Sequence, residues 1–283
     1  MQLDLAAVDL VVRAALREDM PWGDVTTDAL VPPDAPGTGR LMAKARGVLA
    51  GMPVAERVFH AVDAGVAFRV LKPDGSRVKP GDCLGTVSGP TASLLKAERV
   101  ALNFLQRMSG TATLTALYVE AVRGTRARIL DTRKTTPGLR FLERYAVRVS
   151  GGHNHRFCLS DGVLVKDNHL ESLKRRGVGL REALERAREA VPHMTRIEVE
   201  AQSLAQVREA LDAGADVIML DNMPVPQMAK AVRMVNGKVL LEASGGINLK
   251  TVRAVAETGV DLISAGALTH SAPALDISLD LEH

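Results

Sequence analysis

The chain has 283 residues, 46% of them hydrophobic and 24% charged, a composition typical of a soluble globular protein and not of a disordered or fibrous one. Its 36 basic and 33 acidic residues nearly balance, and only 3% of the residues are aromatic, which argues against a nucleic-acid partner. The two cysteines lack CxxC spacing, which excludes a disulfide framework or a zinc module and favours a cytoplasmic location. No apolar run approaches the roughly 18 residues of a membrane span, which excludes a membrane protein.

The N-terminal part, to about residue 89, is predicted to contain one opening helix followed only by short strands and turns. Residues 1–22 place four acidic side chains among apolar ones, which indicates an acidic amphipathic helix and not a signal peptide. Weak alternation over 40–49 and apolar segments at 67–71 and 83–87, bounded by turns rich in Pro, Gly and Asp, predict the strands.

Two helices are expected next. The apolar residues of 94–108 fall largely on one helical face. The segment Ser109-Gly110-Thr111 interrupts this pattern, so we predict a break there and a second helix that ends near Arg123.

From residue 126 onward, short apolar strands alternate with amphipathic helices. Glu200, Asp221 and Glu242 are 21 residues apart, Ser264 follows 22 residues later, and each is predicted to stand where a strand ends. This period is that of a compact β/α unit, and right-handed crossovers then require a parallel sheet. Successive units of this kind close into a (β/α) barrel whose functional face is the carboxyl end of its strands. The alternative is that these polar residues only mark the beginnings of loops.

Cationic side chains concentrate in the first part of this repeat region. They are Arg133, Lys134, Arg140, Arg156 and Lys166, accompanied by His153 and His155. Convergent cations in a concave site indicate a substrate with several phosphate or carboxylate groups. A solvated basic face is the alternative, but it does not account for the glycines that flank these residues.

Two glycine-bearing loops and two acids complete the predicted site. Ser244-Gly245-Gly246 and Ala265-Gly266-Ala267 follow the last two strands, where backbone N–H groups of a barrel approach phosphates. Glu200 and Asp221 are suited to hold Mg²⁺ beside a polyphosphate. A retaining-glycosidase pair of acids, a metal pair at His153 and His155, and a Schiff-base role for Lys166 are the less favoured alternatives.

These residues stand within motifs that resemble one family over nearly the whole chain, in order. The most specific motif is Asp131-Thr132-Arg133-Lys134-Thr135-Thr136-Pro137-Gly138-Leu139-Arg140. Others are Gly151-Gly152-His153-Asn154-His155-Arg156, Lys166-Asp167-Asn168-His169, Glu198-Val199-Glu200, Leu220-Asp221-Asn222 and Glu242-Ala243-Ser244-Gly245-Gly246. The set resembles the quinolinate phosphoribosyltransferases, the decarboxylating nicotinate-nucleotide pyrophosphorylases. Ser150 and Arg144 depart from the family pattern, where glycine and lysine are common, without altering the local chemistry.

The resemblance implies an α/β protein with an N-terminal α/β sandwich-like domain, residues 1–110, and an incomplete (β/α) TIM-like barrel, residues 111–283, whose C-terminal tail can return to the first domain. It also implies a homodimer in which the N-terminal domain of one subunit covers the barrel of the other, so that Arg99 serves the partner's site. Whether the dimers assemble further is left open.

The resemblance further implies a pentosyltransferase of NAD biosynthesis, which joins quinolinate to phosphoribosyl pyrophosphate and releases CO₂ and pyrophosphate, with Mg²⁺ as cofactor. The implied substrate-binding residues are Arg99, Thr132, Arg133, Lys134, His155, Arg156, Lys166, Glu200, Asp221, Ser244, Gly245, Gly246, Ala265, Gly266 and Ala267. Catalytic roles fall to Lys134, Lys166, Glu200 and Asp221, and the last two are the implied magnesium ligands, directly or through water or pyrophosphate. The alternatives are a related enzyme acting on another base, as in the molybdenum-operon relatives of the family, and a metabolite-binding barrel without turnover.

Overall fold

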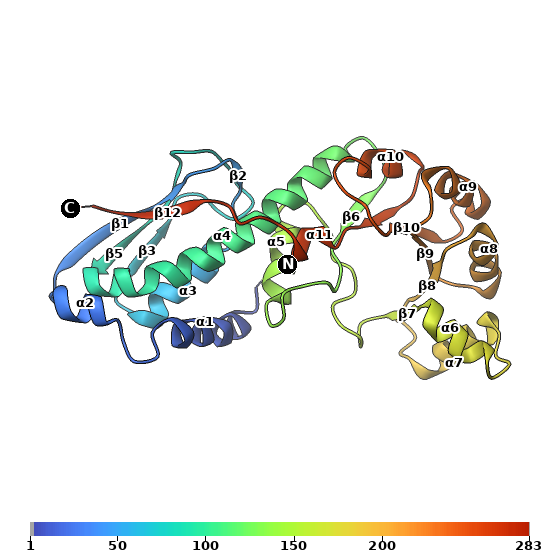
Figure 1. The fold of residues 1–283 in the computed structure, drawn as a ribbon, viewed down its shortest axis with the longest axis horizontal. Coiled ribbons are helices and arrows are strands. Elements are labelled where there is room, and N and C mark those ends of the chain that lie inside the picture. The colour runs from blue at the N-terminus through green and yellow to red at the C-terminus, as the bar shows by residue number, and fades with distance from the viewer. Residues whose placement is uncertain (1–2, 283) are drawn as a thin grey trace. The chain divides into compact units, whose positions relative to one another are not determined.

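The computed structural model describes residues 3–282 and divides them into two units (Figure 1). The first unit comprises the described residues up to Ala116, Thr135–Gly151, and the chain from Leu268 onward. The second unit comprises Leu117–Lys134 and Gly152–Ala267. Among residues 3–282, no helix combines the length and the hydrophobicity that a membrane span needs.

The first unit is built on a four-stranded antiparallel sheet. Its strand order is β12 (Ile277–Glu282), β1 (Pro36–Ala43), β5 (Cys83–Pro90) and β3 (Ala67–Val70). Two short strands, β2 (Gly47–Val48) and β4 (Arg77–Val78), pair separately. The strand from the C-terminal part of the chain therefore lies beside β1, red against blue in Figure 1.

Three helices precede residue 90, not one, so the prediction of a single opening helix there is wrong. Helix α1 (Leu5–Asp19) is confirmed, and α2 (Val25–Leu30) and α3 (Met52–Val62) are additional. The first turn of α3 is capped from a distance: the Asp74 carboxylate accepts the N–H groups of Gly51 and Met52 at 2.8 and 3.0 Å. The capping residue stands more than 20 positions away, but Pro53 in the first turn and the helical spacing of Val54, Val58 and Phe59 are a local signal that was not recognised.

Helix α4 (Thr91–Ala121) is continuous, so the predicted break at residues 109–111 is also wrong. A Cβ on Gly110 would lie 2.0 Å from the Pro273 carbonyl oxygen, which shows that the glycine is required by a close approach of backbone. Ser109 donates its hydroxyl to the Ala50 carbonyl oxygen at 3.1 Å and accepts the Ala50 N–H at 3.0 Å. Ser109 and Gly110 therefore allow close packing against neighbouring segments, and they do not interrupt the helix.

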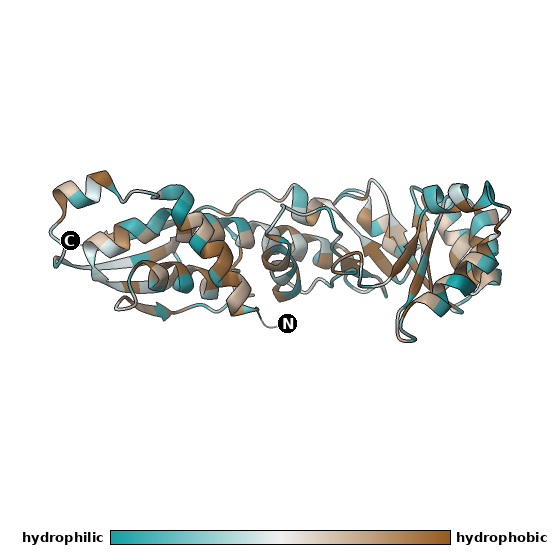
Figure 2. Cartoon of the chain, turned by 90° about the horizontal axis from the view of Figure 1, so that it is seen from below, coloured by the Kyte–Doolittle hydropathy of each residue, from teal (hydrophilic) through white to brown (hydrophobic). Residues whose placement is uncertain are grey.

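Hydrophobic side chains from every layer of the first unit meet in one core. Val12 of α1, Phe59 of α3, Leu84 of β5, Leu105 of α4 and Leu279 of β12 are all buried. Burying each such side chain stabilises the fold by about 1.5–3 kcal/mol. In Figure 2 the brown residues accordingly gather where these helices and strands face one another.

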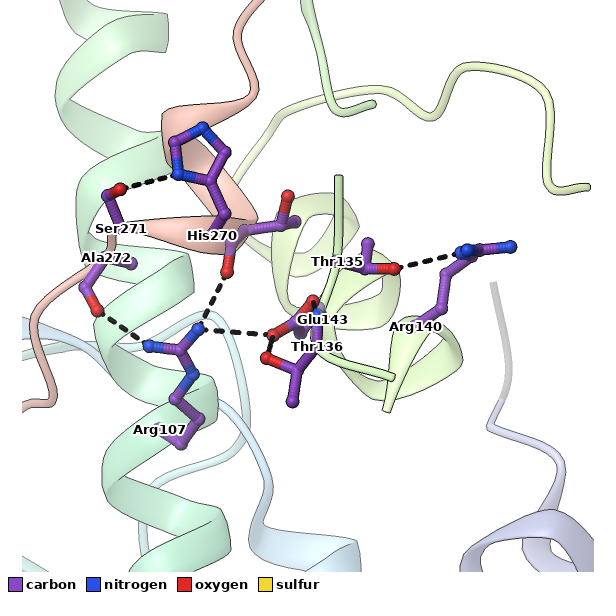
Figure 3. Close-up of polar contacts among 9 residues, drawn as sticks. Arg107, Thr135, Thr136, Arg140, Glu143, His270, Ser271 and Ala272 are labelled. Carbon is purple, nitrogen blue, oxygen red and sulfur yellow. Dashed lines mark hydrogen bonds and ion pairs between the residues drawn. The ribbon is translucent and has the colours of Figure 1, made fainter. Parts of the chain in front are cut away.

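A partly buried polar network holds the loop after residue 134 within the first unit (Figure 3). Arg107 on α4 donates to the carbonyl oxygens of Thr269 and Ala272 at 2.7 and 2.9 Å and lies 3.3 Å from Glu143 Oε1. Thr136 donates its hydroxyl to Glu143 Oε1 at 2.7 Å and its N–H to Oε2 at 3.1 Å. Glu143 belongs to α5 (Arg140–Val149), a helix that the sequence analysis did not predict.

The second unit is a six-stranded parallel sheet. Its order is β6 (Arg128–Leu130), β11 (Leu262–Ser264), β10 (Leu240–Ser244), β9 (Val217–Asp221), β8 (Ile197–Ala201) and β7 (Val163–Val165). The helices are α6 (Asp167–Lys174), α7 (Leu180–Ala190), α8 (Leu204–Ala213), α9 (Val225–Val235) and α10 (Val252–Glu257), and α11 (Ala267–His270) follows β11. The predicted strands all form, and the incomplete barrel is confirmed.

The strand ends differ from the prediction at one position. Strand β10 continues to Ser244, so Glu242 lies in its middle and not at its end. In the parallel ladder Glu242 is level with Met219, which is level with Glu200, whereas Asp221 is level with Ser244. Glu242 and Glu200 are therefore level with each other, and Asp221 lies two residues nearer the carboxyl ends of the strands.

Candidate active site

A cavity of about 340 Å³ opens at the carboxyl ends of the parallel strands. Its lining consists of Thr132, Arg133, Lys134, His155, Arg156, Leu164, Lys166, Glu200, Met219, Asp221, Glu242, Ser244 and Ser264. All of these belong to the second unit. The structure thus brings together nine of the predicted site residues, from Thr132 to Ser244, in one concave place.

Four cations line this cavity: Arg133, Lys134, Arg156 and Lys166. Burial, and then the neighbouring charge of Arg133, lower the pKa of Arg156 from its ordinary value. The Arg156 guanidinium also donates to the Gly162 carbonyl oxygen at 2.9 Å, which fixes its direction. Arginines that repel one another in a partly buried site are stabilised by an anion between them.

Two carboxylates stand among these cations. Lys166 Nζ lies 3.0 Å from Glu200 Oε1, and the Glu200 side chain is only 12% exposed. Asp221 accepts N–H donors from the side chains of Gln202 at 3.4 Å and Asn222 at 3.1 Å. Carboxylate oxygens at the ends of adjacent strands are the hard donors that Mg²⁺ prefers, so this donor set fits the predicted ion.

The loop after β10 has the geometry of a close backbone approach. Gly245 has φ +95°, and a Cβ there would lie 2.2 Å from the Asn222 side-chain oxygen. Ser244 lines the cavity and receives a hydrogen bond from the Ser264 hydroxyl at 3.0 Å. In the next loop the Ala265 N–H donates to the Leu130 carbonyl oxygen, so this amide is already used in hydrogen bonding to β6. The roles predicted for Gly245, Gly246, Ala265, Gly266 and Ala267 stay predictions.

His155, Glu198 and Glu242 form a buried cluster beneath these residues that was not predicted from the sequence. His155 Nε2 lies 3.2 Å from Glu198 Oε2 and 3.5 Å from Glu242 Oε2. Glu198 and Glu242 are 8% and 1% exposed, and one oxygen of each has no hydrogen-bond partner. Among the described residues, these three side chains bring their ligand atoms within 4.8 Å of one another, whereas the less favoured alternative of a metal pair at His153 and His155 finds no such group.

The same cluster reaches a second cavity, of about 660 Å³. His155, Arg156 and Glu242 line both cavities, and the second is also lined by the first residues of strands, such as Arg128 and Val217. The cluster therefore lies at mid-depth in the barrel, between its two ends.

Burial and mutual charge shift the proton equilibria of this cluster. Burial, and then the charge of Glu198, raise the pKa of Glu242, while His155 and Ser264 act to lower it. Burial alone would lower the pKa of His155, but the hydrogen bond to Glu198 and the charges of Glu242, Glu198 and Asp131 together raise it. Glu242 is therefore held largely in its neutral form near pH 7.

The two-residue period of β-strands could have placed both Glu198 and Glu242 inside the barrel. Glu198 and Glu200 are two residues apart in β8, so both side chains face the barrel interior. Glu242 occupies the corresponding inward position of β10. An acid inside an apolar parallel strand is expensive to bury without a partner, and it therefore indicates a functional group.

Two predicted cations fall outside the second unit. Arg99 lies on α4 in the first unit, and its side chain is 60% exposed. Arg140 begins α5 in the same unit and donates to the Thr135 hydroxyl at 3.0 Å. The predicted action of Arg99 across a dimer stays a prediction.

Comparison with known families agrees with this arrangement. A family model described as the N-terminal domain of quinolinate phosphoribosyl transferase matches residues 24–109, and the model of its C-terminal domain matches residues 111–280. The chain belongs to the quinolinate phosphoribosyl transferase family. The family boundary at residues 109–111 falls within helix α4, which continues through it.

Individual relatives are similar over nearly their full lengths. A nicotinate-nucleotide pyrophosphorylase (carboxylating) of Mycobacterium leprae is 46% identical over 95% of this chain and 95% of its own. A probable enzyme of the same name from Bacillus subtilis is 43% identical over 93% of this chain and 90% of its own. The solved nicotinate-nucleotide pyrophosphorylase of Francisella tularensis superposes with a TM-score of 0.93 at 36% identity, covering 99% of this chain and 98% of that one.

Proposed function

We propose that this protein transfers the phosphoribosyl group of phosphoribosyl pyrophosphate to quinolinate, with decarboxylation, in the biosynthesis of NAD. The observation that supports this reaction best is that one cavity is lined by four cations and two acids. They are Arg133, Lys134, Arg156 and Lys166, with Glu200 and Asp221. Family membership and relatives named nicotinate-nucleotide pyrophosphorylase support the same reaction. A metabolite-binding barrel without turnover would not need both acids beside the cations.

Quinolinate carries two carboxylates, and the arginines of the cavity suit them. Arg133 and Arg156 would each pair with a carboxylate through planar, charge-assisted hydrogen bonds. Lys166, already 3.0 Å from Glu200, would stand between quinolinate and the sugar diphosphate. Lys134 would join the arginines around quinolinate, and the loops at Ser244–Gly246 and Ala265–Ala267 would receive the 5′-phosphate.

The chemistry needs no nucleophilic side chain. The pyridine nitrogen attacks the anomeric carbon, and the bond to pyrophosphate breaks with its electron pair leaving on oxygen. Glu200 and Asp221 would stabilise the positive charge that grows at the anomeric carbon and hold the ribose hydroxyls. The cationic ring then accepts the electrons of the carbon–carboxylate bond, CO₂ departs, and the carbon takes a proton from water. Positioning and electrostatics carry the catalysis.

We propose Mg²⁺ as the cofactor, with Glu200 and Asp221 as the residues that would hold it, directly or through water or pyrophosphate. The bound ion would offset negative charge on the departing pyrophosphate. The supporting observation is the pair of carboxylates at the ends of β8 and β9.

We further propose a homodimer in which Arg99 acts in the site of the partner subunit. An exposed arginine on α4, in the unit that does not contain the cavity, is compatible with that role. The segment Glu98-Arg99, followed by Leu102-Asn103, also resembles the family pattern, which supports this role.

The deciding experiment measures CO₂ released from quinolinate labelled in the carboxylate beside the ring nitrogen. Release should require both phosphoribosyl pyrophosphate and Mg²⁺, and nicotinate mononucleotide should form in equal amount. The Arg156→Ala variant serves as the site control and Arg175→Ala, at the exposed residue that follows α6, as the matched surface control. No labelled CO₂ under these conditions, or product formed faster from another base, would overturn the assignment in favour of a relative with a different substrate.

A further inference from the structure

Both ring nitrogens of His155 are already engaged within the protein. Nδ1 accepts the backbone N–H of Arg156 at 2.7 Å. Nε2 lies 3.2 Å from Glu198 Oε2 and 3.5 Å from Glu242 Oε2. The ring therefore joins two inward-facing carboxyl groups of β8 and β10 to the backbone of a substrate-facing arginine.

A second contact fixes the same stretch of backbone. Asp131, fully buried after β6, accepts the His155 N–H at 2.8 Å and a hydrogen bond from the Asn154 side chain. The segment 154–156 is thus held by Asp131 on one side and by the His155 ring on the other. The Arg156 guanidinium then extends from this segment to the Gly162 carbonyl oxygen, 2.9 Å away.

The direction of these hydrogen bonds determines where the ring carries its proton. An Nδ1 atom that accepts an N–H must be unprotonated, so the ring proton belongs on Nε2, where the carboxyl groups accept it. A doubly protonated ring would set two N–H donors against each other at 2.7 Å. The acidic groups that face the ring are Glu198, Glu242 and Asp131, and the cation next to it is Arg156.

We propose that His155 is a positioning residue, which the Glu198–Glu242 pair holds through Nε2 and which in turn holds the Arg156 backbone through Nδ1, so that the guanidinium is aimed at a carboxylate of the substrate. This proposal rests on the proposed function for the identity of that carboxylate. It assigns Glu198 and Glu242 a role in substrate recognition although neither needs to touch the substrate.

The first test reads the ring directly and needs no activity. Histidine is labelled with ¹⁵N, and the His155→Gln variant identifies the His155 signals among the seven histidines. In the neutral ring, at a pH above the raised pKa of His155, we expect two well-separated nitrogen shifts, with the protonated one assigned to Nε2 through its couplings to the ring protons. A proton on Nδ1 in that neutral ring would overturn the proposal.

The second test separates positioning from general damage. Glu242→Gln and Glu198→Gln should each raise the KM for quinolinate about tenfold, within the coupling expected between contacting groups, and leave the KM for phosphoribosyl pyrophosphate unchanged. Combining Glu242→Gln with Arg156→Ala should cost no more than Arg156→Ala alone. The exposed Glu257→Gln is the matched control.

Equal rises in both KM values, or fully additive effects in the double variant, would show that Glu242 only supports the fold and would reject the proposal. The His155 spectrum is independent of turnover. A wild-type protein with the expected spectrum but no CO₂ release would therefore contradict the proposed function and not the hydrogen-bond arrangement.

Discussion

Arg156 combines three influences that a sequence motif does not separate. Its guanidinium is fixed by the Gly162 carbonyl oxygen, its pKa is lowered by burial and by Arg133, and its backbone N–H is bound by His155. An arginine held in this way loses little conformational entropy when it pairs with a carboxylate, so its contribution to affinity should be large.

Arg156→Ala should weaken quinolinate binding by about 2–4 kcal/mol, because a charge-assisted contact is lost. Arg133→Ala should act in the same direction. Isothermal titration calorimetry with quinolinate measures the change. Arg175→Ala should bind like the wild type, because Arg175 forms only an exposed ion pair with Glu171 and does not line the cavity. Wild-type affinity in both cavity variants would contradict the assignment.

Glu242 should make stability fall as the pH rises. Burial raises its pKa in the folded state to about 8 from an ordinary 4.5, so folding takes up a proton there. The stabilisation is complete below pH 4.5 and is lost as the pH passes through about 8. Urea unfolding at pH 6 and at pH 9 should therefore show a larger loss for the wild type than for Glu242→Gln, and parallel losses would refute the assignment.

At the scale of residues, the sequence predicted the groups at strand ends, but it placed Glu242 at a strand end and gave Glu198 no role. Lys166, Asp221 and Ser244 follow or close apolar segments, so local pattern and spacing sufficed. Glu198 and Glu242 stand within strands, and their roles depend on which neighbours share the barrel interior, which one strand alone does not specify.

Elements of the second unit were easier to predict than those of the first. Each strand and helix of the β/α repeat is a local unit with its own apolar pattern, and six strands formed where expected. Helix α3 carries a local apolar pattern that was overlooked, but its cap from Asp74 and the approach of Pro273 to Gly110 of α4 have no local signal. Such contacts join residues far apart in the chain, and local reasoning cannot supply them.

Helix α4 should not tolerate a methyl group at its closest backbone approach. Gly110→Ala would place Cβ 2.0 Å from the Pro273 carbonyl oxygen, and the resulting displacement should cost about 1–3 kcal/mol despite the better helix propensity of alanine. Thermal unfolding measures the change.

Gly179→Ala is the matched control, because Gly179 has negative φ and open space around its Cβ position. Its effect should stay below about 1 kcal/mol. An unchanged or raised Tm for Gly110→Ala would show that the backbone at Pro273 can move aside without loss of stability.

At the scale of the whole molecule, the proposed shared site predicts complementation between inactive chains. Arg99→Ala and Lys166→Ala lie in different units, so a mixed dimer would carry both lesions in one site and none in the other. Random mixing makes half the dimers mixed with one intact site of two, so activity should return to about one quarter of the wild type.

The measurement is quinolinate-dependent CO₂ release after the two variants are refolded together, with heterodimers verified by native mass spectrometry. Each variant refolded alone is the control. Verified heterodimers without any gain in activity would place Arg99 in the site of its own chain or restrict it to folding.

The pairing of β1 with β12 has a consequence for the order in which the chain can be assembled during synthesis. Thr38 is paired with Glu282, and Ala43 with Ile277. At ~5–20 residues per second, a ribosome needs roughly 10–50 s between making these two strands. Throughout that interval β1 is an open sheet edge, which is a template for mispairing with other chains. Until β12 is made, no strand covers this edge of β1.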